Sequence, residues 1–240
     1  MLRLFPAALA IAATTAIASP ALAQDQGFTV SLGYFGPTGA DGRVNGDVLN
    51  ADRCIDVTFA CEPLFFDVGD FGGFIINGEY VFGLGKFFEA SGGVGFYQRT
   101  VPSVYSNLTY PDGGEIRQDL KLRTVPITGI VRFVPTGRHA AIQPYLGIGI
   151  AAINWHYSET GDFVDPSDNT IFPARYVDSG TEVAPLYLGG VRAPMGGGFL
   201  VGGEIRYQHA DAPLDPSVDF LGSRLDLGGW SYLGTMTWRF

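Results

Sequence analysis

The sequence GWSYLGTMTWRF at residues 229–240 decides the fold. Its residues alternate in character, so a β-strand would place two different sets on its opposite faces. One set is rich in aromatic residues, and the other carries Arg239 and three hydroxyl side chains. A soluble sheet buries a mostly aliphatic face, whereas a strand of a membrane barrel turns apolar side chains to lipid and polar ones to the lumen. The stretch therefore predicts a transmembrane β-strand, with Trp238 and the terminal Phe240 facing lipid.

The stretch FLVGGEIRYQ at residues 199–208 repeats this pattern, with Glu204 and Arg206 on its less apolar face. A predicted tight turn, Met195-Gly196-Gly197-Gly198, precedes it, and a long polar connection at 210–228 follows it. Short turns at one end and long loops at the other are typical of membrane barrels, whose turns face the periplasm and whose loops face outward.

The same alternation predicts an all-β fold, an eight-stranded antiparallel transmembrane β-barrel with short periplasmic turns and long extracellular loops. The predicted strands are residues 28–35, 71–82, 87–97, 120–133, 140–157, 183–192, 199–208 and 229–240. Short turns are expected at 83–86, 135–139 and 195–198, and long loops at 36–70, 98–119, 158–182 and 210–228. Pro126, Pro144 and Pro185 fall inside strands, where each removes a ladder donor, and bulges would absorb some of them.

The first residues predict a secretion signal. Arg3 precedes an apolar stretch at 4–18, and Ser19-Pro20-Ala21-Leu22-Ala23 supplies a small-residue cleavage site. We expect residues 1–23 to be a signal peptide and residues 24–240 to form the barrel domain.

The chain contains 34 Gly, 13% aromatic and 16% charged residues. Its formal net charge of −9 argues against a nucleic-acid partner.

Charged residues inside the predicted strands indicate the content of the lumen. An eight-stranded barrel is just wide enough for side chains to fill its interior, so acids and bases on the lumen side are expected to pair with one another. The sequence thus predicts a packed polar lumen. The members of this lumen charge cluster are Glu79, Glu89, Arg132, Arg192, Glu204, Arg206 and Arg239.

With these strands in place, the chain resembles the outer-membrane β-barrel superfamily that includes OmpX, OmpW and the membrane domain of OmpA. The final strand, with Trp238 and Phe240, looks like the C-terminal signal that the barrel-assembly machinery reads, and residues 144–159 are similar to mid-barrel strands of such proteins. The resemblance implies a location in the bacterial outer membrane, insertion by that machinery, and contact with outer-membrane lipid and lipopolysaccharide. The long first loop with Cys54 and Cys61 departs from the compact OmpX pattern.

Cys54 and Cys61 are the only cysteines, and an even pair in an exported chain favours one disulfide over a metal site. Acidic loop residues offer oxygen ligands for a divalent cation, but nothing matches a calcium loop, so solvated loop charge is the preferred interpretation. The candidates for such a site are Asp162, Asp165, Asp168 and Asn169. We therefore expect no metal and no cofactor.

The residues at 206–211 faintly resemble the His-x-Ser segment of lipid A deacylases, but Asp211 stands where the nucleophilic serine would be. We therefore expect that the protein is not an enzyme and that His209 is a polar residue at a strand border.

The predicted function is that of a structural or interaction scaffold, which displays surface loops whose ligand is unknown. The alternative is a narrow channel or carrier for small hydrophobic molecules, and lipid A modification or a lipocalin-like soluble barrel is less favoured. Interfacial girdles are expected from Trp155, Tyr157, Trp230, Tyr232 and Trp238.

Overall fold

The computed structural model describes residues 26–53, 64–165 and 167–240. Residues 1–23, predicted to be a signal peptide, and the cysteines Cys54 and Cys61 lie outside the described residues. None of the helices in the described part of the chain is long and apolar enough to cross a membrane.

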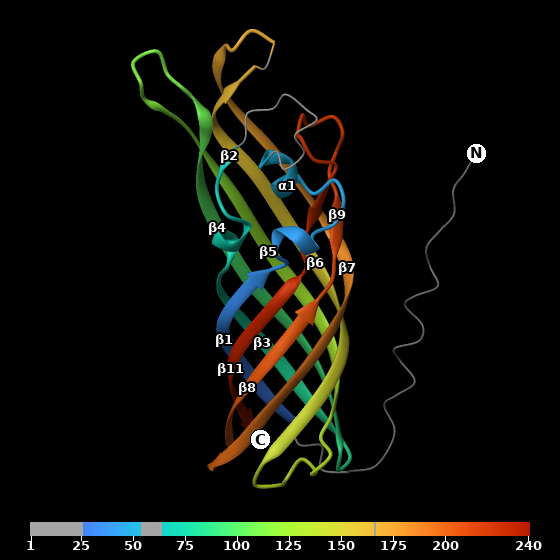
Figure 1. Ribbon diagram of the computed structural model, residues 1–240. Helices are drawn as coiled ribbons and strands as arrows, with labels where there is room; N and C mark the ends of the chain where they lie inside the picture. The colour runs from blue at the N-terminus through green and yellow to red at the C-terminus, as the bar shows by residue number, and fades with distance from the viewer. Residues whose placement is uncertain (1–25, 54–63, 166) are drawn as a thin grey trace, which may run out of the picture.

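Eight antiparallel strands form a closed ring, which confirms the predicted barrel (Figure 1). Each strand pairs with the next along the ring, and β1 pairs with β11 from Gly27 opposite Arg239 to Pro37 opposite Gly229. Closure matters because lipid offers no hydrogen-bond partner to a free strand edge. The strands are β1 (Gln26–Pro37), β3 (Gly73–Leu84), β4 (Phe88–Thr109), β5 (Glu115–Phe133), β6 (Gln143–Val164), β7 (Ile171–Gly196), β8 (Phe199–Gln208) and β11 (Gly229–Arg239).

The connections at the upper end of the barrel carry short elements. Between β1 and β3 lie η1 (Ala40–Gly42), α1 (Val48–Asp52), β2 (Leu64–Phe65) and η2 (Val68–Phe71). Between β8 and β11 lies a small hairpin of β9 (Asp211–Pro213) and β10 (Arg224–Asp226). Figure 1 shows these elements gathered over one mouth of the barrel, while the chain's C-terminus and the start of β1 lie at the other.

Two of the predicted loops are instead strand, which corrects the sequence interpretation. The stretch 98–119 belongs mostly to β4 and β5, which are connected by residues 110–114, and the stretch 158–182 belongs mostly to β6 and β7, which are connected by residues 165–170. Both hairpins rise beyond the other strands in Figure 1. Their polar composition suggested loops, but a strand that has left the membrane faces water and carries polar side chains on its outer surface.

Strand β6 shows where the membrane-facing wall ends. In its lower half, Leu146, Ile148 and Ile150 point outward and are exposed. In its upper half the outward positions include the polar residues Asn154 and His156, and the inward residues Ile153, Trp155 and Tyr157 are buried. Because the strand is continuous, the apolar face changes from outside to inside near Ala152. This inversion marks the passage from a lipid to an aqueous exterior.

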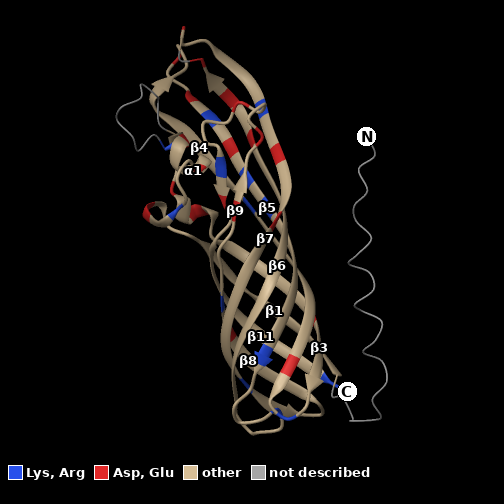
Figure 2. Ribbon diagram, turned by 90° about the vertical axis from the view of Figure 1, so that its right-hand side faces the viewer, with Lys and Arg blue, Asp and Glu red and all other residues tan. Residues whose placement is uncertain are grey.

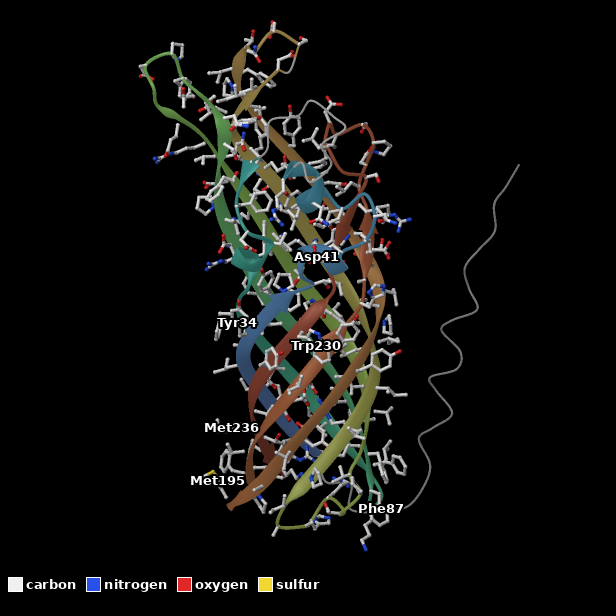
Figure 3. The ribbon with its side chains drawn as sticks, viewed as in Figure 1. Tyr34, Asp41, Phe87, Met195, Trp230 and Met236 are labelled. Atoms are coloured by element: carbon white, nitrogen blue, oxygen red, sulfur yellow. The ribbon has the colours of Figure 1, made fainter. Side chains whose placement is uncertain are left out.

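The inversion corrects two of the predicted girdle residues. Trp155 and Tyr157 are buried inside the upper barrel, because they fall on the inward face of β6 above the inversion. Trp230, Tyr232 and Trp238 of β11 lie exposed on the outer wall. Figure 3 places Trp230 and Met236 on this wall, with Tyr34 from the neighbouring β1.

Pro126 interrupts the β4–β5 ladder without shifting it. The ladder pairs Val94 with Ile127 and resumes at Tyr97 with Thr124 in the same register. A proline therefore removes one donor at this point, and the barrel tolerates the local gap without the bulge that the sequence suggested.

A pair of substitutions on one face of β6 tests the inversion. Ile148→Arg places a charge in lipid and is expected to lower the free energy of unfolding by about 2–4 kcal/mol. Asn154→Arg, on the same face above the inversion, is expected to change it by less than about 0.5 kcal/mol. Denaturant unfolding of the barrel in phospholipid vesicles measures both, and equal costs would contradict the assignment of the membrane edge.

Candidate functional site in the barrel lumen

A balanced ion-pair cluster crosses the middle of the lumen. Arg132 of β5 contacts Glu79 of β3 at 2.6 Å and Glu204 of β8 at 3.4 Å. Arg206 pairs with the same two carboxylates. All four side chains are buried, so each charge depends on its partners and not on water. We call these four residues the middle cluster.

Neutral side chains complete the hydrogen bonding of the middle cluster. The hydroxyl of Ser91 donates to Glu79 at 3.0 Å and accepts from Arg132 at 2.7 Å. The hydroxyl of Tyr145 donates to Glu204 at 3.0 Å. The strand period explains this convergence, because these residues lie on the inward faces of five strands, β3, β4, β5, β6 and β8, of one narrow ring.

A second cluster, the lower cluster, lies nearer the short turns. The carboxylate of Glu89 contacts Arg192 at 2.6 Å, Arg239 at 2.9 Å and Arg138 at 3.2 Å. Gln143 accepts hydrogen bonds from Arg192 and Arg239, each at 3.1 Å. Figure 2 shows that charged residues are sparse in the lower barrel compared with the upper strands and loops.

Tyr145 joins the two clusters. Its ring lies 5.8 Å from the guanidinium carbon of Arg132 and 5.3 Å from that of Arg192. An aromatic ring attracts cations on its face, and this attraction is stronger where water is excluded. The polar part of the lumen is therefore one connected network from Glu89 to Glu204.

The upper lumen is filled by an apolar plug, which corrects the prediction of a polar lumen throughout. Val48 and Leu49 of α1 and Phe71 of η2 are buried in one core with inward residues of the strands. Tyr97 packs edge-on against Phe35 with ring centroids 5.1 Å apart, and its hydroxyl donates to the carbonyl of Phe71. Loop residues thus complete the core of the upper barrel.

A buried ion pair fastens the plug to the last loop. Arg43 contacts Asp47 at 2.6 Å, and it donates to the carbonyl oxygen of Asp226 at 2.8 Å. Asp47 also accepts from the backbone of Leu49, as the N-cap of α1, and from the backbone of Asp226. We call Arg43, Asp47 and Asp226 the latch.

Two buried carboxyl groups face each other above the plug, outside the membrane-spanning part of the wall. Asp52 ends α1, and Glu159 lies on β6 beside Tyr157. Within the described chain, Asp52 Oδ2, Glu159 Oε1 and the Tyr157 hydroxyl oxygen have no hydrogen-bond partner. Burial and the nearby Glu159 raise the pKa of Asp52 well above its usual range, and burial raises the pKa of Glu159 to about 7.

All seven residues of the predicted lumen charge cluster lie inside the barrel, divided between the middle and lower clusters. Sequence reasoning missed Arg138, which it placed in a turn, and the neutral partners Ser91, Gln143 and Tyr145. Ser91 has the same parity as Glu89 on β4, and Tyr145 has the parity opposite to the apolar Leu146 and Ile148 on β6, so strand parity was a usable signal for both. The latch and the buried acids come from loops and strand extensions, where no such period was expected.

The other candidates from the sequence do not form a reactive site. His209 is exposed, and Asp211 forms an ion pair with Arg224. Asp162 accepts from Tyr110 at 2.7 Å, while Asp165 and Asp168 each accept from the backbone two residues on. No group of three or more His, Cys, Asp or Glu side chains suited to a metal occurs among the described residues.

Trp238 and Phe240, the predicted assembly signal, lie exposed on the outer wall. The backbone N–H of Phe240 donates to the carbonyl oxygen of Gln26.

Comparison with solved structures identifies the fold. OprG, an outer-membrane protein of Pseudomonas aeruginosa, superposes with a TM-score of 0.52 at 12% identity, covering 90% of this chain and 97% of OprG. Neisserial surface protein A gives 0.45 at 11% identity, covering 90% and 97%, and Ail of Yersinia pestis gives 0.44 at 11%, covering 90% and 99%. No protein-family model and no curated protein matches the sequence. The chain has the fold of the small outer-membrane β-barrels.

The lower cluster predicts a large cost for removing the Glu89 carboxylate, which contacts three of its guanidinium groups. Glu89→Gln leaves three guanidinium groups without their shared counter-charge and is expected to reduce the free energy of unfolding by about 3–5 kcal/mol. The matched control is Glu115→Gln, which breaks an exposed 2.8 Å pair with Arg117. That control is expected to cost no more than about 0.5 kcal/mol. Denaturant titration in detergent micelles measures both, and a small effect for Glu89→Gln would refute the lumen assignment.

The buried acids predict a pH dependence of the plug. When the plug is unfolded, Glu159 has its ordinary pKa of 4.5, and when the plug is folded, its pKa is about 7. The folded state therefore binds the proton of Glu159 more tightly. The plug is therefore most stable below pH 4.5 and loses stability as the pH rises through 7. Hydrogen exchange of the α1 amides, corrected for intrinsic rates, measures this loss. Glu159→Gln should flatten the profile and Glu115→Gln should not; an unchanged profile in Glu159→Gln would exclude this origin.

Proposed function

We propose that this chain spans the bacterial outer membrane as a closed barrel and serves as a scaffold that holds two β-hairpins above the membrane surface. The hairpins are those of β4 with β5 and of β6 with β7. Their strands are continuous with the barrel wall, so a ligand that binds them would meet a rigid, preorganised surface.

The filled lumen is the observation that carries this proposal. The cavity between the plug and the strands measures about 20 Å³, and the one within the middle cluster about 10 Å³. Such volumes hold about one water molecule each. An ion would have to break buried ion pairs in both clusters and then displace the plug, so a resting open path is disfavoured.

The outer wall supports a membrane location. Exposed apolar side chains surround the lower barrel, including Phe74, Phe96, Ile127 and Val191 from four different strands. Exposed apolar surface of this extent is unfavourable in water, and lipid removes the cost. Both described chain ends lie at the short-turn end, which agrees with a periplasmic placement of that end.

Planar-bilayer recording tests the closed lumen. The exported chain, refolded and inserted, is expected to carry no discrete ionic current, and its proteoliposomes should take up neither sugars nor hydrophobic solutes faster than protein-free vesicles. A general porin in the same bilayer provides the positive control. Different gel migration before and after boiling verifies that the barrel is folded. Reproducible conductance steps would contradict the scaffold proposal and favour a channel, and faster uptake of hydrophobic solutes would favour a carrier.

A further inference from the structure

A row of aromatic rings follows the inner side of the β6–β7 hairpin above the plug. Phe163 of β6 lies directly opposite Phe172 of β7, and their ring centroids are 6.4 Å apart. Phe163 also packs edge-on against Tyr176 at 4.9 Å, and Tyr176 lies 6.1 Å from Phe220 in the connection between β9 and β10. Phe220 in turn lies 5.6 Å from the buried Tyr157. The row therefore begins in the core of the upper barrel and continues upward along the hairpin.

The upper rings of this row keep part of their surface exposed. Phe163, Phe172 and Tyr176 are half-buried, whereas Tyr157 at the foot of the row is fully buried. Pairing of β7 with β8 begins only at Leu186, and above that residue no strand of the described chain pairs with the edge of β7 that faces away from β6. The inner side of the hairpin is therefore an aromatic surface that a ligand from the water above the membrane can reach.

Carboxylates border the aromatic row. Asp178 lies two residues below Tyr176 on the same side of β7, and its side chain accepts from the backbone N–H of Asp215 at 2.7 Å. This hydrogen bond holds the connection between β9 and β10 beside the hairpin. Burial raises the pKa of Tyr176, and the negative charge of Asp219 in that connection raises it further, so Asp219 lies close to the rings. One carboxylate from the hairpin and one from the connection therefore border the same surface.

This surface carries no basic side chain in the part of the chain that the structure describes. The inward residues of β6 between 153 and 163, the inward residues of β7 between 172 and 182, and the connection at 214–223 contain no Lys, Arg or His. Arg175 lies on the opposite side of β7. We call the set the acidic aromatic surface, and its members are Phe163, Phe172, Tyr176, Asp178, Asp219 and Phe220.

The chemistry of the acidic aromatic surface selects a positively charged ligand. The face of an aromatic ring attracts cations, and carboxylates attract them over a longer distance. Residues 172 and 178 are six positions apart on one strand, which corresponds to about 20 Å. A small cation would reach only one carboxylate or one ring, whereas an extended peptide with several basic side chains can contact the whole row.

We propose that the acidic aromatic surface binds a positively charged segment of an external polypeptide, with Lys or Arg side chains over the rings and beside Asp178 and Asp219. The proposal deepens the scaffold function and rests on it, because it names the partner of one displayed hairpin. The external location rests on the proposed membrane orientation. The recognition itself rests on the aromatic row and its two carboxylates, and it does not depend on whether the lumen conducts.

Peptide binding to the full exported chain tests the surface. The barrel is refolded in neutral phosphatidylcholine nanodiscs and titrated against a fluorescent peptide of alternating lysine and serine, about 12 residues long, while the anisotropy is measured. The same peptide with acetylated lysines is the matched probe without charge, and it is expected to bind about tenfold more weakly or worse. Added salt should weaken binding of the lysine peptide, because exposed charges are screened.

Two variants of the surface separate the contributions of charge and rings. Asp178→Asn/Asp219→Asn is expected to weaken binding of the lysine peptide about fivefold to tenfold. The matched control Glu115→Gln/Asp119→Asn removes the same number of charges from the outward side of β5, and it is expected to change the affinity less than about twofold. Phe163→Leu keeps an apolar side chain but removes the ring between Phe172 and Tyr176, and is expected to weaken binding about threefold.

Each contrary result overturns a defined part of the proposal. Equal affinity of Asp178→Asn/Asp219→Asn and the parent chain would overturn the surface, provided that gel migration shows both are folded. An equal loss in Glu115→Gln/Asp119→Asn would assign the binding to net charge, and equal binding of the acetylated peptide would overturn the choice of a cationic partner. Competition by free arginine amide at the concentration of the peptide would overturn the choice of a polypeptide.

The failure of this proposal can be distinguished from the failure of the scaffold function. Conductance steps in the planar bilayer, with peptide affinity unchanged, would overturn only the scaffold. A silent bilayer together with no binding of the lysine peptide would overturn only the acidic aromatic surface.

Discussion

The structure depends on one constraint: a continuous, closed ladder of hydrogen bonds passes through two different solvents. In lipid the wall must be apolar outside, and above the lipid it must be polar outside. Without a bulge, alternate residues of a β-strand stay on the same face along its whole length. The apolar residues must therefore move from the outward positions to the inward positions where the surroundings change. On β6 this change occurs near Ala152, below Asn154 and His156. The same rule turns Trp155 inward and leaves Ile150 outward, although both are large and apolar.

The interior follows from the exterior. Where the outer face is apolar, the inner face receives the charged residues, and the narrow ring forces Glu79, Arg132 and their partners into direct contact. Where the outer face is polar, the inner face is apolar, and it needs an apolar filling. The first loop supplies that filling through Val48, Leu49 and Phe71. The ion-pair clusters thus fill the barrel where lipid surrounds it, and the plug fills it where water surrounds it.

The sequence alone indicated the number of strands, their order and the inward charges, because a period of two is strong wherever one face meets lipid. Residues 199–208 were assigned with the bounds that the structure gives. The upper hairpins were missed because polar residues such as Arg117 and Asp119 occur both in loops and on water-facing strands. The latch could not be predicted from the sequence, because Arg43 and Asp226 are 183 positions apart and neither lies in a periodic segment. Contacts between two irregular loops leave no local pattern to read.

The latch has a consequence for the order of assembly. It joins the first connection of the barrel to the last, across 183 positions of chain, so it can form only after the connection between β8 and β11 has reached the plug. Forming such a distant contact is slow because the intervening chain must first be ordered. The latch is therefore expected to be among the last contacts of the barrel to form. A chain stalled before closure would expose the apolar residues of α1, giving cellular quality control a feature that separates unfinished barrels from finished ones.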